Sequence, residues 1–312
     1  MEVKKSSQKK RSLDDSQSDA SSTSSYLLVT GKTQSEHNDD SSYYTQSFES
    51  NMTDQDEEGP DDEAAKTVGS PATYEDLREE IMNICKNGCK FIIGIDYTVS
   101  NTTQGSSSFG GKCLHDVLSV NPYQKVITCL GETIESLIGN EDVIHAFGFG
   151  DSKVRNKDVF PLNPDKQCRT FLDVYDSYNT ITNRIRFGNP TDFSPIINKA
   201  LDIVNETNEF HVLLIISDCQ VSEVKRTKDA LIRASQYALS IVVIGIGDGP
   251  WTLMEQMEAT GNRDEKMSNF NFVNYNHIVS KAANPDVEVA EAILQNMKSQ
   301  RRFLHDMGYL ED

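Results

Sequence analysis

The sequence predicts an α/β fold: a doubly wound, mostly parallel six-stranded sheet with helices on both faces, preceded by a disordered tail. Two observations favour this fold. Short apolar runs recur after about residue 90, each bounded by polar residues, as is typical of strands buried on both faces. Between these runs lie segments with apolar residues at helical spacing, and such a β-then-α rhythm is that of parallel sheets.

The predicted elements follow one another from residue 73 to the C-terminus. Thr73 is an expected N-cap for the opening helix, because Glu75 and Asp76 then occupy the first turn, where negative charge is favourable. Apolar side chains at helical spacing predict the later helices, and apolar runs of four to seven residues predict strands. Helices are expected at residues 73–86, 122–138, 171–185, 193–204 and 223–239, near Trp251, and at residues 286–307. Strands are expected at residues 90–95, 143–149, 211–216, 240–246 and 270–273.

Residues 1–72 have a different composition. Ser, Asp, Glu and Gln dominate, 15 residues are acidic and 7 are basic, and no hydrophobic period is sustained. A segment of this kind cannot bury enough apolar surface to offset the entropy lost on ordering, so it is predicted to be disordered. The remaining residues, 73–312, suffice for a single well-buried α/β domain.

Polar oxygen donors follow two of the predicted strands and open one helix. Asp96, Thr98 and Ser100 occupy alternate positions directly after the strand at residues 90–95. Asp218 closes the run at residues 211–216, and Thr191 precedes a predicted helix. Ligands of parallel α/β sheets bind where strands end at their carboxyl edge, and Mg²⁺ prefers oxygen ligands. The pattern therefore predicts a metal site at this edge.

The set Asp96-x-Thr98-x-Ser100, then Thr191, then Asp218 resembles the metal-ion-dependent adhesion site of von Willebrand factor type A domains. Further segments, in the same order, are similar to the A-type domain of copines and to the related domain of plant RING-type ubiquitin ligases. These segments are residues 109–115, 121–123, 147–151, 193–198 and 245–251. The resemblance extends from about residue 76 to about residue 309 and implies a von Willebrand factor A-like fold.

The resemblance implies a non-enzymatic, divalent-metal-dependent protein-interaction module of copine type. Asp96 and Asp218 supply two negative charges, which neutralise one Mg²⁺ (or Mn²⁺), while Thr98, Ser100 and Thr191 supply neutral hydroxyl oxygens. A coordination position left to water or to a partner makes such an ion a docking point. The expected partner is therefore a protein that offers an acidic side chain to the metal.

Composition and termini bear on location and on other partners. The net charge of −18 argues against nucleic acid and against simple docking on anionic lipid. The polar start of the chain is unlike a signal peptide, and no run approaches the roughly 20 apolar residues that cross a bilayer, so direct membrane insertion is not expected. The six scattered cysteines are interpreted as reduced thiols in a cytoplasmic protein.

Two alternatives stay open at this stage, and two others are disfavoured. The first open alternative is a substrate-recruiting component of a ubiquitin ligase, and the second is a calcium-dependent phospholipid-binding copine-like protein that acts through partners. A nucleotide loop at residues 245–249 is disfavoured, because the glycines lack the G-x-G-x-x-G spacing. A nucleophilic pair of Cys113 and His115 is disfavoured too, because nothing else in the sequence supports it.

Two residues depart from the pattern of the family. Asp192 follows Thr191 where copines usually have a neutral residue, and we expect a third carboxylate near the cation to repel an acidic partner ligand. Cys219 follows Asp218 where these domains commonly have glycine. If that position needs a positive φ, cysteine is strained there, and its side chain is expected to pack beneath the loop.

Deletion of residues 1–72 tests the predicted domain boundary. Because this segment contributes no periodic apolar face to a core, its removal is expected to leave the melting temperature within about 2 °C, as for a stability change below roughly 0.5 kcal/mol. Thermal unfolding of the full and truncated chains measures the difference. A cooperative loss of stability on truncation would mean that the tail docks on the domain.

Overall fold

The computed structural model describes residues 74–84, 89–139, 142–261 and 269–306. All of these residues belong to one structural unit, residues 67–312. The predicted disordered tail at residues 1–72, its boundary and the expected N-cap Thr73 lie outside the described residues.

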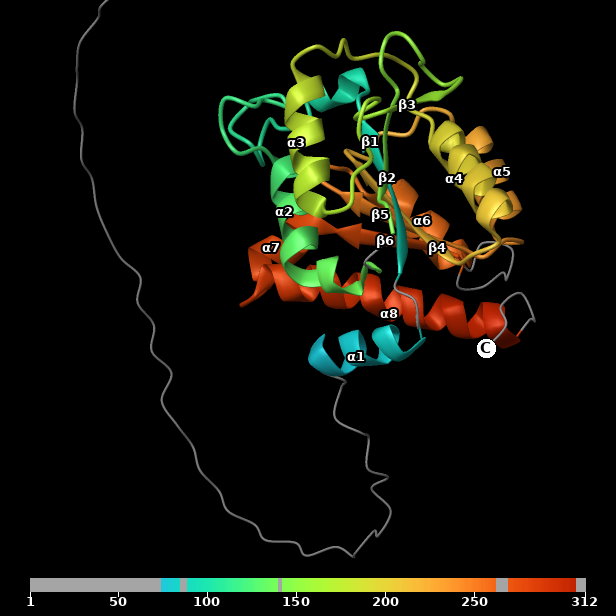
Figure 1. Ribbon diagram of the computed structural model, residues 1–312. Helices are drawn as coiled ribbons and strands as arrows, with labels where there is room; N and C mark the ends of the chain where they lie inside the picture. Colours follow the sequence, from blue (N-terminus) through green and yellow to red (C-terminus); the bar gives the residue numbers. More distant parts are fainter. Residues whose placement is uncertain (1–73, 85–88, 140–141, 262–268, 307–312) are drawn as a thin grey trace, which may run out of the picture. The chain divides into compact units, whose positions relative to one another are not determined.

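Six strands form one sheet in the order β3-β2-β1-β4-β5-β6 (Figure 1). Neighbouring strands are parallel except at one edge, where β3 runs antiparallel to β2. The predicted mostly parallel, six-stranded sheet is therefore confirmed. The strands are β1 (Lys90–Asp96), β2 (His145–Phe149), β3 (Val159–Pro161), β4 (His211–Ser217), β5 (Leu239–Gly245) and β6 (Phe270–Asn274).

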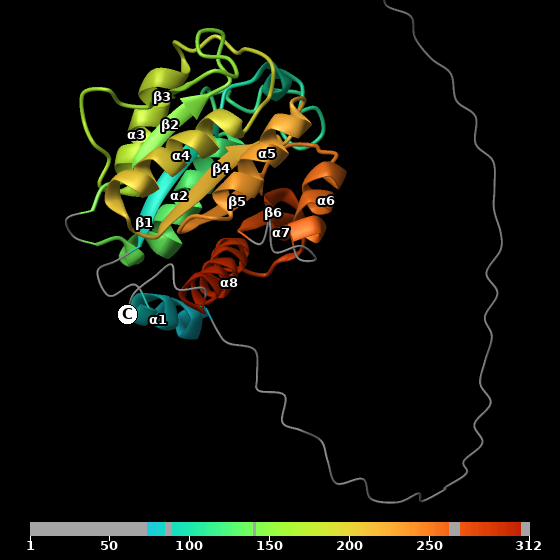
Figure 2. The same ribbon diagram turned by 90° about the vertical axis from the view of Figure 1, so that its right-hand side faces the viewer.

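Helices cover both faces of the sheet, and Figure 2 shows α4 and α5 lying over one of them. That face is covered by α4 (Ser194–Thr207), α5 (Val224–Ala234) and α6 (Thr252–Gly261). The other face is covered by α2 (Pro122–Ile134), α3 (Phe171–Thr182), α7 (Tyr275–Lys281) and α8 (Pro285–Asp306). The first described helix, α1 (Tyr74–Ile84), packs against α8.

Each face of the sheet has its own apolar core, and the central strands contribute to both. Along β1, Ile93 and Ile95 pack under the α2–α3–α8 layer, whereas Ile92 packs under the α4–α5–α6 layer. Side chains of a strand alternate between faces, so a strand buried on both faces needs a continuous apolar run. This requirement explains the unbroken apolar runs from which β1, β4 and β5 were predicted.

The register of the central strands brings their carboxyl ends to one level. Ile95 of β1 pairs with Ile216 of β4, and Ile216 pairs with Ile244 of β5. The residues that follow, beginning with Asp96 on β1, therefore lie at one edge of the sheet. Above this edge, β1 leads into the short 3₁₀ helix η1 (Val99–Thr102).

The predicted elements match the structure apart from their ends and two omissions. The helix predicted at residues 122–138 is α2 followed by a 3₁₀ turn, η2 (Glu135–Leu137), and the helix predicted at residues 223–239 ends at Ala234. The sequence located five of the six strands. It missed β3, which is three residues long and contains a proline at the sheet edge, where proline is tolerated. It also missed the short helix α7. In the described part of the chain, no helix is both long and apolar enough to cross a membrane.

Candidate metal centre

Two buried aspartates lie side by side at the carboxyl edge of the sheet. Asp96 is the last residue of β1, and Asp218 directly follows β4, the parallel neighbour of β1. Both side chains are fully buried. Predicted from separate parts of the sequence, they meet because their strands are adjacent and in register.

The Asp96 carboxylate is held by one hydrogen bond at each oxygen. Its Oδ1 accepts from the backbone N–H of Thr98 at 2.8 Å, and its Oδ2 accepts from the hydroxyl of Ser217 at 2.5 Å. The first bond folds the loop after β1 back onto the strand end, and the second links β1 to β4. The orientation of the carboxylate is therefore set by both central strands.

Asp218 is less completely satisfied. Its Oδ1 accepts from the backbone N–H of Gln220 at 3.1 Å, whereas its buried Oδ2 has no hydrogen-bond partner within the described residues. Burial and the nearby charge of Asp96 raise the pKa of Asp218 to about 7, and burial also raises the pKa of Asp96. The two buried like charges repel each other, and the Oδ2 of Asp218 stays unpaired. The pair therefore lacks a positive partner.

Two hydroxyl groups stand beside the carboxylates on the loop after β1. The Thr98 Oγ1 and the Ser100 Oγ lie 3.1 Å apart, and the nearby Ser100 side chain partly opposes the rise in the pKa of Asp218. Thr98 is fully buried, and Ser100, on η1, is half-buried. The structure thus brings together four of the five predicted metal ligands: Asp96, Thr98, Ser100 and Asp218.

The fifth predicted ligand, Thr191, lies on a loop that is attached to the same edge from both sides. Upstream, Gly188 forms a parallel bridge with Thr98, and its carbonyl accepts from Val99 N–H at 2.9 Å. At the other side, the Thr191 carbonyl accepts from the backbone N–H of Ser222 at 3.0 Å. Within the described ranges, the Thr191 hydroxyl has no hydrogen-bond partner, so it is available as an oxygen donor.

Asp192 has two partners that the sequence did not suggest. Its Oδ1 accepts from the backbone N–H of Ser194, at the start of α4, at 2.8 Å, and its Oδ2 lies 3.2 Å from Nε of Arg226 on α5. Arg226 therefore balances the charge that was expected to repel an acidic partner ligand, and the expected repulsion stays a prediction. The negative charge lies near the N-terminus of α4, where it is favourable, and forms an ion pair that the sequence could not indicate, because Arg226 is 34 positions away in the chain.

Cys219 meets both expectations made for it. Its φ is +60°, in the left-handed region that favours glycine, and its side chain is buried among the residues under α4 and α5. Its backbone N–H donates to the Ser217 hydroxyl at 2.9 Å, and this bond holds the strained turn after Asp218. Burial and the two aspartate charges raise the pKa of its thiol, which keeps it protonated.

His115 lies beneath the carboxylate pair and makes no nucleophilic pair with Cys113. Its Nε2 is 2.8 Å from the backbone carbonyl of Asp96, and its Nδ1 is 2.9 Å from the hydroxyl of Tyr178. Burial lowers its pKa to about 3, so the ring is neutral. Burial also raises the pKa of the Cys113 thiol. Both ring nitrogens are engaged elsewhere, which removes the base that a nucleophilic cysteine requires.

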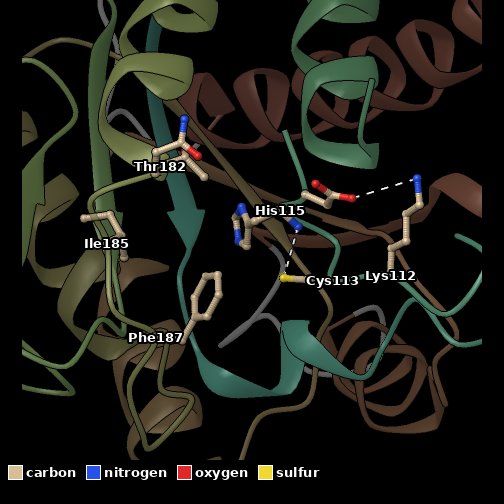
Figure 3. A pocket seen from close by; sticks show the side chains of 8 residues that line it. Lys112, Cys113, His115, Thr182, Ile185 and Phe187 are labelled. Carbon is tan, nitrogen blue, oxygen red and sulfur yellow. Dashed lines mark hydrogen bonds and ion pairs between the residues drawn. The ribbon is translucent and has the colours of Figure 1, made fainter. Parts of the chain in front are cut away.

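A cavity of about 430 Å³ opens beside this histidine (Figure 3). In the view of Figure 3, Ile185 and Phe187 lie on one side of His115, and Cys113 and Lys112 lie on the other. The loop of Lys112 and Cys113 therefore faces the segment that carries the chain from α3 towards Thr191.

The glycine-rich segment after β5 holds a neighbouring loop. Asp248 accepts hydrogen bonds from the backbone N–H groups of Ser107, at 2.8 Å, and of Ser108, at 2.7 Å. Gly247 and Gly249 have positive φ values, which allow the turn around Asp248. This structural use accounts for the segment that was considered, and disfavoured, as a nucleotide loop.

The donor set fits a hard divalent cation. Two carboxylates, two hydroxyls 3.1 Å apart and the unpaired, buried Oδ2 of Asp218 form an all-oxygen site with a net negative charge. Among the residues that the structure describes, no three His, Cys, Asp or Glu side chains cluster as a metal site, so hydroxyl groups must complete this one. A bound cation would supply the positive charge that the buried pair lacks.

Sequence reasoning missed three residues that shape the centre. Ser217 orients Asp96, and His115 anchors its backbone. Gly150 has a φ of +77°, and a Cβ there would lie 2.3 Å from Cγ2 of Thr98, so only glycine lets β2 approach the loop. The position of Ser217 at a strand end, next to Asp218, was a signal in the sequence that could have indicated its role. The roles of His115 and Gly150 depend on contacts with residues far away in the chain, so the sequence contained no such signal for them.

Comparison with known proteins identifies similar chains. The family model described as Copine matches residues 113–311. Copine family protein 1 of Caenorhabditis elegans is 38% identical over 226 residues, which cover 70% of this chain and 20% of that protein. E3 ubiquitin-protein ligase RGLG5 of Arabidopsis thaliana is 39% identical over 237 residues, which cover 70% of this chain and 54% of that protein. The chain thus spans about half, or less, of the length of these relatives.

Solved structures give a more distant match. The manganese-loaded TRAP protein of Plasmodium vivax is 12% identical, with a TM-score of 0.43, over 65% of this chain and 74% of that chain.

Substitution of the aspartates tests the metal centre. Mg²⁺ at 100 times its Kd is expected to stabilise the protein by about 2.7 kcal/mol, which raises the melting temperature by roughly 5–10 °C for a domain of this size. Asp96→Ala and Asp218→Asn should abolish this shift. In EDTA, Asp218→Asn should be at least as stable as the parent, because it removes one of two repelling buried charges.

Asp176→Asn is the matched control, since Asp176 is an exposed aspartate on α3. It should retain the full response to Mg²⁺. Isothermal calorimetry and thermal unfolding measure the two effects independently. Unchanged Mg²⁺ affinity in both site variants would contradict the assignment of these aspartates as metal ligands.

Proposed function

The chain belongs to the copine family, and on this premise we propose that it is a non-enzymatic protein-interaction module that docks an acidic partner ligand at a metal-ion-dependent adhesion site. Asp96, Thr98, Ser100, Thr191 and Asp218 would hold the metal, Mg²⁺ or Mn²⁺. The ion would supply a positive charge to which a carboxylate of the partner binds.

One observation carries the proposal. Asp96 and Asp218 are buried together at the carboxyl edge of the sheet, with the Oδ2 of Asp218 unpaired. Burying two adjacent carboxylates without a counter-charge costs free energy, and a fold that serves only stability would not retain them. Their cost is offset when a divalent cation binds, which supports a site built for a metal.

The surroundings of the centre suit an acidic ligand. Asp192 is paired with Arg226 and accepts from the first backbone N–H of α4, which supports the view that its charge is balanced locally. Val99, between Thr98 and Ser100, is 41% exposed. An exposed apolar side chain next to an ion gives a partner a contact that needs no metal, and interfaces commonly combine such apolar centres with polar contacts.

A second candidate function is substrate recruitment for a ubiquitin ligase. The relatives RGLG5, RGLG4 and RGLG2 of Arabidopsis thaliana are named E3 ubiquitin-protein ligases, and this observation favours the alternative. The chain aligns with about half of each of these proteins, and its six cysteines form no C-x-x-C pair. In this alternative the module binds the substrate, and a separate protein transfers ubiquitin.

A ubiquitin-chain assay with E1, E2 and ubiquitin separates these alternatives. The purified chain alone should form no ubiquitin chains. Chain formation without an added ligase would contradict a non-enzymatic module. We also propose a cytoplasmic location, which the free thiols of the five described cysteines support.

Metal-dependent docking is tested on an array of short peptides in which each Glu-centred sequence has a Gln-centred twin. The full chain is expected to bind a subset of the Glu peptides in Mg²⁺ or Mn²⁺ and to lose them in EDTA, because only a carboxylate donates a charge to the ion. Thr191→Ala should also lose them, because the substitution removes an oxygen donor of the site.

Thr180→Ala is the matched control, since Thr180 is an exposed threonine on α3, and it should bind the peptides like the parent. Fluorescence polarisation of selected peptides gives the affinities. Equal binding of the Glu and Gln twins, or full binding in EDTA, would place the partner surface elsewhere on the molecule.

The environment of Asp192 yields a separate prediction. Asn at this position keeps an acceptor for Ser194 N–H, and the negative charge that is lost is one that Arg226 already balances. Asp192→Asn should therefore change peptide affinity less than about threefold, below roughly 0.7 kcal/mol. A larger gain in affinity would show that the charge of Asp192 does reach the ligand.

A further inference from the structure

We propose that His115 is a positioning residue of the metal centre, which acts by holding the backbone carbonyl of Asp96 and so the start of the loop that bears Thr98 and Ser100. This inference rests on the proposed metal-binding function. It goes beyond that function because it assigns a role to a buried residue that touches neither the metal nor the partner.

The hydrogen bonds of His115 have a defined direction. A backbone carbonyl can only accept, so the Nε2 that lies 2.8 Å from the Asp96 carbonyl must carry the proton. In a neutral imidazole the other nitrogen, Nδ1, is then the acceptor. The Tyr178 hydroxyl has two acceptors within reach, Nδ1 of His115 at 2.9 Å and Oδ1 of Asn121 at 3.3 Å. The shorter contact and the tautomer of His115 favour donation to Nδ1, so hydrogen bonds link Tyr178 to His115 and His115 to Asp96.

The imidazole is fixed in place by stacking. Its centroid lies 3.9 Å from the ring of Tyr123 and 4.7 Å from the ring of Tyr97, with interplanar angles of 13° and 12°. The Tyr123 hydroxyl is also 3.0 Å from the Asp96 carbonyl. A ring held between two others cannot swing away, so its N–H stays directed at the carbonyl.

This arrangement connects the strand end to the helical layer. Tyr123 lies on α2 and Tyr178 lies on α3, whereas Asp96 ends β1. Asn101, on η1, donates to the carbonyls of Asp96, at 3.3 Å, and Thr98, at 3.1 Å. The backbone of the metal loop is therefore anchored from below by two helices, as well as from the side by β4.

The anchor opposes a force that the centre itself creates. Asp96 and Asp218 repel each other, and this repulsion favours a loop that opens and separates the carboxylates. A loop fixed at the Asp96 carbonyl keeps the ligand oxygens close together, so that little of the free energy of metal binding is needed to order them. Partners that orient metal ligands typically change metal affinity by about 10–100-fold when they are removed.

The test compares two substitutions of similar size that differ in their ability to donate. His115→Gln retains an N–H near the position of Nε2, whereas His115→Met has a similar shape and no donor. Both lose the aromatic stacking, so both should lose stability in EDTA. His115→Met should bind Mg²⁺ about 10–100-fold more weakly than the parent by calorimetry, and His115→Gln should recover most of that loss.

A second pair of variants avoids large changes in packing. Tyr178→Phe removes the donor to Nδ1 and should weaken Mg²⁺ binding several-fold. Tyr275→Phe removes a hydroxyl from a buried tyrosine on α7 and should leave Mg²⁺ binding unchanged. Nitrogen NMR of the parent should report the Nε2–H tautomer of His115, and Tyr178→Phe should reduce its population.

The outcomes separate this inference from the function on which it rests. A parent chain with no Mg²⁺ affinity would overturn the metal centre and this inference together. A parent that binds Mg²⁺, with His115→Met and Tyr178→Phe binding it equally well, would overturn the positioning role alone. Equal losses in His115→Met and His115→Gln would likewise overturn it, because the donor would then make no difference.

Discussion

The arrangement of this domain depends on the burial of two like charges at the ends of adjacent parallel strands. Asp96 and Asp218 are brought together by the register of β1 and β4, and neither is exposed to water. Their mutual repulsion and their desolvation both oppose folding at neutral pH. The hydrogen bonds around them limit this cost: Ser217 and the Thr98 N–H serve Asp96, and the Gln220 N–H serves Asp218. These hydrogen bonds leave the Oδ2 of Asp218 without a partner, and a cation bound there would balance its charge.

Rigidity at this edge comes from elements that lie far apart in the chain. The sheet supplies Ser217, the α4–α5 face supplies the Asp192–Arg226 pair, and the opposite face supplies the stacked rings around His115. Gly150 and Gly188 let two further loops approach closely, because a side chain at either position would collide with neighbouring atoms. Buried polar networks are costly unless every member is satisfied. Here the hydrogen bonds of Ser217, His115 and Asn101 support the metal loop, whereas the Oδ2 of Asp218 within the site stays unpaired, as expected of a binding centre built on a rigid support.

Local structure accommodates the two residues that depart from the family pattern, Asp192 and Cys219. An additional carboxylate at Asp192 is accommodated because the start of α4 accepts negative charge and because Arg226 lies within reach. A cysteine in the left-handed region at position 219 is accommodated because its thiol is buried and its N–H is bonded to Ser217. Neither change alters the donor set. The region matched here makes up 20% of a copine and 54% of a protein named as a ubiquitin ligase, so this domain is common to proteins with different names.

The sequence by itself determined the fold class, five of the six strands and the identity of the candidate ligands. Strands buried on both faces require continuous apolar runs, and donors at strand ends are visible as a local pattern after Asp96 and before Cys219. Only the tertiary structure decided what depends on contacts between distant residues. It paired Asp192 with Arg226, placed His115 under the Asp96 carbonyl, put Gly150 against Thr98 and added the short edge strand β3. The physical reason is that periodicity and propensity act over a few neighbouring residues, whereas the direction of a buried polar side chain is set by whichever partner the completed fold brings within hydrogen-bonding distance.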